Sequence, residues 1–141
     1  MSVALLVITH NKIGTELLAT ATRMLGHCPV RAKTLEVGER DDPDWLRERA
    51  ACLADELDDG SGVLILTDLF GSTPANVANG LDGGHEVRVL AGVNLPMVVR
   101  VFNYHALELG AVAEKALNGG RDGVLLCQTG GIPAPPGEHA R

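Results

Sequence analysis

Short apolar runs alternate along the chain with longer segments in which apolar residues recur at helical spacing. The runs lie at residues 3–8, 30–37, 63–67 and 86–91, and a fifth follows at 123–128. Alternating strands and helices are typical of βαβ units joined in a parallel sheet. The pattern therefore predicts an α/β domain with four parallel strands and a fifth strand near its C-terminal end.

The segments between the runs carry signals for helices. A first helix ends at Gly26, and its apolar stripe comprises Leu17, Leu18, Ala21, Met24 and Leu25. A second begins after Asp41-Asp42-Pro43 and ends at Asp58-Asp59-Gly60. Its expected apolar face comprises Trp45, Leu46, Ala50, Leu53 and Leu57.

Three shorter helices complete the predicted pattern. One runs from Thr73 to about Leu81, and another begins near Pro96, after the turn 91–96. The last spans about residues 106–118, where Asn118-Gly119-Gly120 is expected to end it. Residues 129–141 contain too much Gly and Pro to join a packed element, so we expect a flexible C-terminal tail.

Composition narrows the class of protein. The 141 residues fit one domain, and 45% apolar with 3% aromatic residues predicts an aliphatic core. A net charge of −6 without a cluster of Lys and Arg disfavours nucleic acid and anionic membranes as partners. No apolar run reaches the roughly 20 residues that span a bilayer, and no cleavable leader is visible. We therefore expect a cytoplasmic protein, peripheral to the membrane at most.

Most cysteines and histidines are expected to be structural. The three cysteines are widely spaced and form no Cys-x-x-Cys pair, which indicates neither a disulfide framework nor a zinc site. We expect Cys28, Cys52 and Cys127 to be reduced thiols that pack as small apolar side chains. Four histidines are expected to be structural or solvated: His27, His85, His105 and His139. No metal and no cofactor are expected.

The stretch that points to chemistry is residues 67–76, Thr-Asp-Leu-Phe-Gly-Ser-Thr-Pro-Ala-Asn. It places Asp68 at the end of a strand, with Thr73 as the expected N-cap and Pro74 as the first helical residue. Backbone N–H groups at such a helix start favour an anion such as phosphate. Because His10 also follows an apolar run, it is expected at the same ligand-binding edge of the sheet.

The histidine after the first run, residues 67–76 and the segment Gly-Val-Asn-Leu-Pro-Met at 92–97 occur together in this order. Together they resemble the enzyme IIA domains of the mannose family of the bacterial phosphoenolpyruvate-dependent sugar phosphotransferase system. The resemblance covers residues 1–128 as one domain. It implies a flavodoxin-like three-layer sandwich of four parallel strands, plus a fifth antiparallel strand exchanged across a homodimer, for which residues 123–128 are the expected segment.

The resemblance also implies a phosphoryl carrier. The phosphorylated small carrier HPr would donate to His10, which passes the group to a separate IIB component or holds it as a regulatory signal. Asp68 would bind one ring nitrogen, fix the tautomer and leave the other nitrogen free to attack phosphorus. The N–H groups of Ser72 and Thr73, with the Thr73 hydroxyl, are the expected phosphate donors. Asn94 and Pro96 are expected to shape the site wall.

Two positions depart from the family's pattern. Ser72 and Asn11 stand where the family usually has glycine. Ser72 keeps its N–H, so anion binding should survive unless the position requires a positive φ. Asn11 tolerates left-handed backbone better than most residues. Neither change removes a chemical group, although both could alter the transfer rate or the choice of partner.

Other functions remain open at this point. A fold of this class can be a non-covalent effector-binding module or a receiver phosphorylated on aspartate. Receivers need an acidic cluster for a divalent metal, and the first strand ends in Ile8-Thr9-His10 without acids. A nucleotide site would need a Gly-rich first turn, which is also absent.

Overall fold

The computed structural model describes residues 2–81 and 84–127 of the chain. Its sheet has four parallel strands in the order β2-β1-β3-β4. The strands are β1 (Ala4–His10), β2 (Ala32–Val37), β3 (Val63–Thr67) and β4 (Val87–Ala91). The helices are α1 (Ile13–Leu25), α2 (Pro43–Leu57), α3 (Thr73–Asn79), α4 (Leu95–Asn103) and α5 (Leu109–Asp122). The alternation of apolar runs and helical segments therefore predicted the described parallel sheet correctly.

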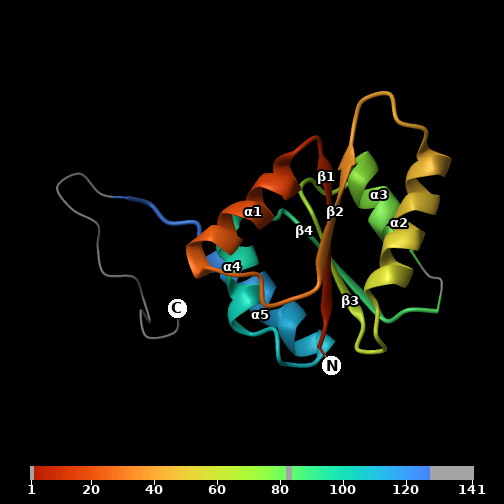
Figure 1. Ribbon diagram of the computed structural model, residues 1–141. Coiled ribbons are helices and arrows are strands. Elements are labelled where there is room, and N and C mark those ends of the chain that lie inside the picture. Colours follow the sequence, from red (N-terminus) through yellow and green to blue (C-terminus); the bar gives the residue numbers. More distant parts are fainter. Residues whose placement is uncertain (1, 82–83, 128–141) are drawn as a thin grey trace.

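Helices cover both faces of the sheet. In Figure 1, α1, α4 and α5 lie on one side of the strands, and α2 and α3 lie on the other. The two central strands are buried on both faces: residues 3–8 and 63–66 are each at most 3% exposed. Such strands read as continuous apolar runs, because neither face of the strand meets water. The fold is thus a three-layer α/β sandwich of the flavodoxin-like class.

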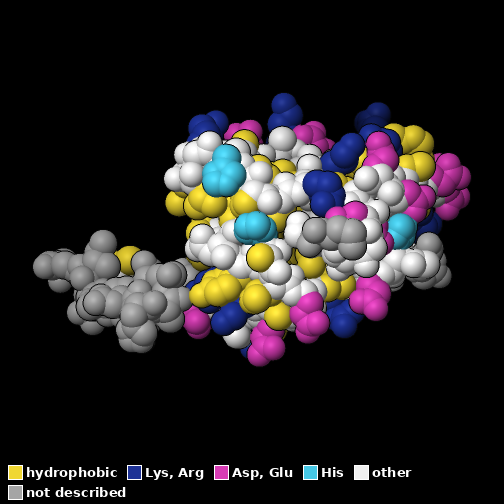
Figure 2. All heavy atoms as spheres, turned by 60° about the horizontal axis from the view of Figure 1, so that its bottom comes forward, with side chains coloured by type: hydrophobic (Ala, Val, Ile, Leu, Met, Phe, Trp, Pro, Cys, Tyr) yellow, Lys and Arg dark blue, Asp and Glu magenta, His cyan; other side chains and the backbone are white. Residues whose placement is uncertain are grey.

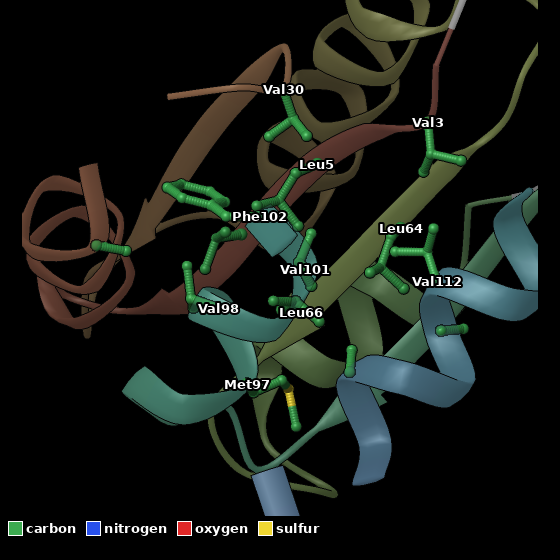
Figure 3. Close-up of a cluster of buried hydrophobic side chains, with 14 of the residues drawn as sticks. Val3, Leu5, Val30, Leu64, Leu66, Met97, Val98, Val101, Phe102 and Val112 are labelled. Carbon is green, nitrogen blue, oxygen red and sulfur yellow. The ribbon is translucent and has the colours of Figure 1, made fainter. Parts of the chain in front are cut away.

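Alternate side chains of the central strands enter two aliphatic cores. Figure 3 shows the core under α4 and α5, where Leu5 and Leu64 meet Phe102 and Val112. The opposite core joins Leu6 and Ile65 to α2 and α3. Both cores are built mainly from Val, Leu, Ile and Ala, as the low aromatic content predicted. Because they hold β1 and β3 rigidly side by side, the ends of these strands have fixed relative positions.

Helix α5 differs from the prediction, because it continues through Gly119 and Gly120 to Asp122. A Cβ atom on Gly119 would lie 2.7 Å from Cβ of Arg100, and one on Gly120 would lie 2.7 Å from Cε of Met97. The two glycines therefore allow α5 to approach α4 closely. This packing outweighs the low helix propensity that led us to expect a helix end here.

Several smaller expectations were also wrong. Ser72, not Thr73, is the N-cap of α3, and the helix ends at Asn79 rather than near Leu81. Met24 and Trp45, assigned to apolar helix faces, are 61% and 51% exposed. The three cysteines are exposed rather than buried, because Cys28 and Cys127 lie outside helices and strands and Cys52 lies on the outer face of α2.

The run at 123–128 does not form a strand in the single chain as far as it is described. Gly123 follows α5 directly, and residues 124–127 are irregular. Val124, Leu125 and Leu126 are 75%, 50% and 87% exposed. Gln128 and the predicted tail at 129–141 lie outside the described residues. Exchange of this segment between two chains therefore remains a prediction.

Surface charge of both signs is dispersed on the face that carries the amino ends of the strands. Figure 2 shows Lys and Arg side chains interspersed there with Asp and Glu. This mixture agrees with the net charge of −6 and the lack of a basic cluster in the sequence. Within residues 2–81 and 84–127, no helix is both long and apolar enough to cross a membrane.

Candidate active site

His10 and Asp68 meet at the edge formed by the carboxyl ends of the strands. His10 is the last residue of β1, and Asp68 directly follows β3, its neighbour in the sheet. Oδ2 of Asp68 lies 2.8 Å from Nδ1 of His10 and also accepts the His10 backbone N–H at 3.1 Å. One carboxylate oxygen therefore holds both the main chain and the ring of the histidine.

This contact determines which ring nitrogen can react. An ionised carboxylate only accepts hydrogen bonds, so Nδ1 of His10 carries the hydrogen and Nε2 of the neutral ring keeps its lone pair. The His10 side chain is 41% exposed, whereas that of Asp68 is 12% exposed. No described residue makes a hydrogen bond to Nε2. In its neutral form the ring would thus present the Nε2 lone pair at the surface in a fixed orientation, with a sheltered carboxylate behind it.

The turn that follows His10 requires a residue in the left-handed backbone conformation. Asn11 has a φ of +48° and is the non-glycine residue with positive φ in the described chain. Its N–H donates to the carbonyl of Val37 at 3.0 Å, which ties the turn to the end of β2. Asparagine accepts this conformation more readily than most residues. The replacement of the family's glycine by Asn11 is therefore compatible with the backbone.

The corner between β3 and α3 places its positive φ at Gly71, with a value of +81°. Ser72 has a φ of −88° in extended backbone, so serine fits without strain where the family usually has glycine. However, Ser72 donates both its N–H, at 3.2 Å, and its hydroxyl, at 2.6 Å, to the carbonyl of Leu69. Ser72 is thus not the free donor that we expected.

Of the two expected phosphate donors, Thr73 is the one whose donor groups are not bound within the described protein. It is the first residue of α3, and neither its N–H nor its hydroxyl makes a hydrogen bond to another described residue. Pro74 follows and has no N–H to offer. Thr73 therefore offers a backbone and a side-chain donor at the same corner as Asp68.

Asn94 and Pro96 have structural roles that the sequence did not reveal. Oδ1 of Asn94 accepts the N–H of Met97 at 3.0 Å and caps α4, while Nδ2 donates to the carbonyl of Gly120 at 3.0 Å. Pro96 lies against Gly123, where a Cβ would come within 2.4 Å of the proline ring. Both residues thus join α4 to α5. Their role as a wall of the His10 site remains a prediction.

Sequence reasoning missed a second pairing of histidine with aspartate. Nδ1 of His85 lies 2.6 Å from Oδ2 of Asp58, and Nε2 contacts Oδ1 of Asp55. Hydrogen bonds to Asp55 and Asp58 raise the pKa of His85 above its usual value. The bond to His85, aided by the N–H groups of Gly60 and Gly62, lowers the pKa of Asp58. The spacing of Asp55 and Asp58 by three residues was a signal, but their partner lies 27 residues further along the chain.

The other two histidines that the structure describes show no comparable arrangement. His27 is exposed after α1, Nδ1 of His105 is buried without a partner among the described residues, and His139 lies outside them. Within residues 2–81 and 84–127, no three side chains of His, Cys, Asp or Glu are grouped to hold a metal ion.

A shallow hollow of about 550 Å³ lies between α1 and β2. It is open to solvent, and Leu18, Val30 and Ala32 contribute to its apolar lining, with Arg23 and Lys33 beside them. His10 and Asp68 do not line it. The paired histidine therefore lies on an exposed edge of the protein and not in this hollow.

Comparison with known proteins agrees with the fold and the motifs. The family described as "PTS system fructose IIA component" matches residues 4–117. The "PTS system mannose-specific EIIAB component" of Escherichia coli (strain K12) is 33% identical over 101 residues, which are 70% of this chain and 31% of the relative. The chain therefore spans about a third of the length of that curated relative.

Solved structures of this family share the fold. A mannose/sorbose-specific IIA subunit from Enterococcus faecalis superposes with a TM-score of 0.83 at 24% identity, covering 94% of this chain and 100% of that one. The IIA protein associated with the fucose utilization operon of Streptococcus pneumoniae gives a TM-score of 0.74 at 24% identity, with 89% and 96% covered. Since the family match extends over nearly all of the four-stranded sheet and its helices, the chain belongs to the EIIA-man family of phosphotransferase-system IIA components.

Proposed function

We propose that this IIA component carries a phosphoryl group on Nε2 of His10, taken from the phosphorylated form of HPr and passed to a IIB component. The observation that carries the proposal is the double contact of Asp68 with His10. A single carboxylate oxygen binds the ring at 2.8 Å and the backbone at 3.1 Å. It therefore orients the imidazole and leaves Nε2 available for transfer.

The transfer step follows from this geometry. The lone pair of Nε2 forms the new bond to phosphorus, and the bond between phosphorus and the donor's ring nitrogen breaks, its electron pair remaining on the donor. The hydrogen on Nδ1 stays in place, and the phosphorylated His10 ring becomes cationic. Asp68 stabilises that charge, because its carboxylate already accepts the Nδ1 hydrogen.

Thr73 is the proposed donor to the phosphoryl oxygens. The loose transition state leaves little covalent chemistry to the protein and spreads charge over the three equatorial oxygens, so catalysis depends on positioning and on donors for these oxygens. The N–H and hydroxyl of Thr73 make no hydrogen bond to another described residue. Ser72 can contribute only if it releases the carbonyl of Leu69, to which both its donors are bound.

The surface beside His10 suits a protein donor. Ile13 begins α1 three residues after His10 and is 47% exposed. Leu69 and Phe70 follow Asp68 directly and are 61% and 83% exposed. Exposed apolar side chains so close in the chain to His10 and Asp68 can be covered by the docked carrier, which would exclude water from the transfer.

The test is mass spectrometry of the intact protein after incubation with phosphoenolpyruvate, enzyme I and HPr. We expect the mass of one phosphoryl group to be added, to be lost in acid and to map to His10. The His10→Ala variant should remain unmodified, and omission of HPr should abolish labelling of the wild type. A stable wild type that stays unlabelled beside a labelled HPr would refute the carrier proposal and favour the non-covalent effector-binding module, with the hollow between α1 and β2 as its first site to examine.

We further propose a homodimer in which residues 123–128 pair with the partner's sheet. The described part of this segment exposes Val124, Leu125 and Leu126, and among the described strands β4 pairs with β3 alone. An exchanged strand would cover both the apolar side chains and the open edge. Light scattering should give a dimer for the full chain and a monomer after deletion of 123–141. Deletion of 129–141 alone is the control and should leave a dimer; a dimer that survives the longer deletion would contradict the exchange.

A further inference from the structure

Helix α1 begins without a capping side chain of its own. Lys12 occupies the N-cap position and makes no side-chain hydrogen bond to the helix. Its ammonium group is a donor and cannot accept a backbone N–H. The N–H of Gly14, in the first turn of α1, instead donates to Oγ1 of Thr9 at 2.7 Å. Thr9 belongs to β1, so the strand itself caps the helix that follows it.

The contact between Thr9 and Gly14 is close and buried. Thr9 is 1% exposed, and Gly14 is buried. A Cβ on Gly14 would lie 2.7 Å from Cγ1 of Val7 and 3.0 Å from Oγ1 of Thr9. The start of α1 can therefore approach β1 only because residue 14 is glycine. The Thr9 hydroxyl then satisfies a backbone donor that water cannot reach.

His10 lies directly between the points at which this turn is held. Its own N–H is bound by Asp68, the next N–H, of Asn11, is bound by Val37, and the preceding side chain, of Thr9, binds Gly14. The turn bends through the left-handed conformation of Asn11, with φ at +48°. Loss of one of these bonds would allow the backbone on which the His10 ring is mounted to shift.

We propose that Thr9 is a positioning residue for phosphoryl transfer, whose hydroxyl fixes the β1–α1 turn and thereby the direction of the His10 ring. This inference rests on the proposed carrier function. Thr9 does not touch the phosphoryl group; it acts through the backbone of residues 10–14. Because a misplacement of about 1 Å can cost up to about 100-fold in rate, even a small shift of the turn is measurable.

Thr67 offers a matched control on the neighbouring strand. It precedes Asp68 as Thr9 precedes His10, and it is 0% exposed. Oγ1 of Thr67, in contrast, has no hydrogen-bond partner among the described residues. Replacement of threonine by valine keeps the shape and removes the hydroxyl. The same change therefore removes a hydrogen bond at residue 9 and none at residue 67.

The experiment compares Thr9→Val, Thr9→Ser and Thr67→Val in transfer from phosphorylated HPr. We expect Thr9→Val to lower kcat about 10-fold with KM nearly unchanged, since the docking surface is intact. Thr9→Ser should restore kcat to within about twofold, because it keeps the hydroxyl, and Thr67→Val should match the wild type. Full activity of Thr9→Val, or an equal loss in Thr67→Val, would overturn the proposal.

Nuclear magnetic resonance of the His10 ring separates this proposal from the carrier function. Nitrogen shifts report the tautomer and titration of the ring without any phosphoryl donor. Thr9→Val should reduce the preference for the tautomer with hydrogen on Nδ1, whereas Thr9→Ser and Thr67→Val should not. An unaltered ring in a folded Thr9→Val variant would refute the positioning role even where the wild type is phosphorylated. If the wild type is not phosphorylated but the ring responds as expected, the carrier function fails and with it the role of Thr9 in transfer, while the hold of the Thr9 hydroxyl on the His10 ring is still demonstrated.

Discussion

Two histidines of this protein are hydrogen-bonded to aspartate, at opposite edges of one sheet, and the two arrangements differ chiefly in the number of carboxylates around the ring. At the carboxyl edge, His10 gives one ring nitrogen to Asp68 and leaves the other without a described partner. At the amino edge, just before β4, His85 gives both nitrogens to carboxylates, those of Asp58 and Asp55. The His10 side chain is 41% exposed and that of His85 is 20% exposed.

The difference separates a histidine suited to reaction from one suited to structural binding. Two carboxylates around one ring favour the imidazolium, because a neutral ring has a single N–H and would turn a lone pair toward the second carboxylate. An imidazolium has no lone pair to attack phosphorus. One carboxylate, in contrast, orients a neutral ring and leaves it nucleophilic. Under the proposed function, the number of bound carboxylates would therefore distinguish the histidine that carries the phosphoryl group from the one that does not.

Removal of each histidine gives the largest contrast between the two sites. His10→Ala should abolish phosphorylation by HPr, because the nucleophile is gone, with little change in the free energy of unfolding. His85→Ala should retain phosphorylation at close to the wild-type rate. Transfer rates and urea unfolding of both variants would measure this. Phosphorylation of the His10→Ala protein would show that another residue is the carrier.

Removal of the carboxylate at the reactive site should give the next largest effect. Asp68→Ala should lower the rate of phosphoryl transfer about 100-fold, because the ring loses its preferred tautomer and the product loses its counter-charge. Asp58→Ala at the other site serves as the matched control and should leave the rate unchanged. An Asp68→Ala protein that transfers at the wild-type rate would show that Asp68 does not orient His10.

The smallest effect concerns the pH dependence of stability at His85. Its pKa is raised in the folded protein by Asp55 and Asp58, so its contribution is complete below the unfolded pKa of about 6.5 and is lost as pH rises through the folded pKa. The difference in free energy of unfolding between wild type and His85→Ala should be about 1 kcal/mol at pH 6 and should decline toward pH 9. A difference that is constant over this range would show that His85 is not bound as an imidazolium.

Asp58 sets the lower end of the pH range in which its contact with His85 stabilises the fold. Its pKa is lowered in the folded protein, mainly by the hydrogen bond to His85, so its contribution is complete above the usual value of 3.8 and is lost as pH falls further. Stability from this pair should therefore be largest between the ordinary pKa values of the carboxyl group and the imidazole. Unfolding of the Asp58→Asn variant as a function of pH would measure separately the stability that is lost when Asp58 is protonated at low pH.

The core of the reactive site could be predicted from the sequence because it depends on topology. His10 and Asp68 each follow an apolar run, and parallel neighbouring strands bring such positions to one edge. The sequence did not reveal that both donors of Ser72 bind the carbonyl of Leu69, within a turn shaped by Gly71. The preference of glycine for helix ends likewise did not reveal that Gly119 and Gly120 lie inside α5, where close packing on α4 prevails.

The second histidine site escaped prediction for a related reason. His85 lies in the loop before β4, and its partners lie at the end of α2, two elements that the sequence pattern does not pair. The Thr9 contact is local, but a threonine at the end of a strand is not a usual capping position for the next helix. Both features depend on how the chain turns between elements, which hydrophobic periodicity does not specify.

The 58 positions that separate His10 from Asp68 along the chain have a consequence for folding. Local contacts cannot bring the two together, because α1, β2 and α2 lie between β1 and β3 in the chain. Pairing of parallel strands across such a crossover is slow compared with formation of a helix. A folding chain would thus gain its oriented histidine only when the central strands have paired. Under the proposed function, the time at which a refolding chain first accepts a phosphoryl group would therefore report when the sheet has assembled.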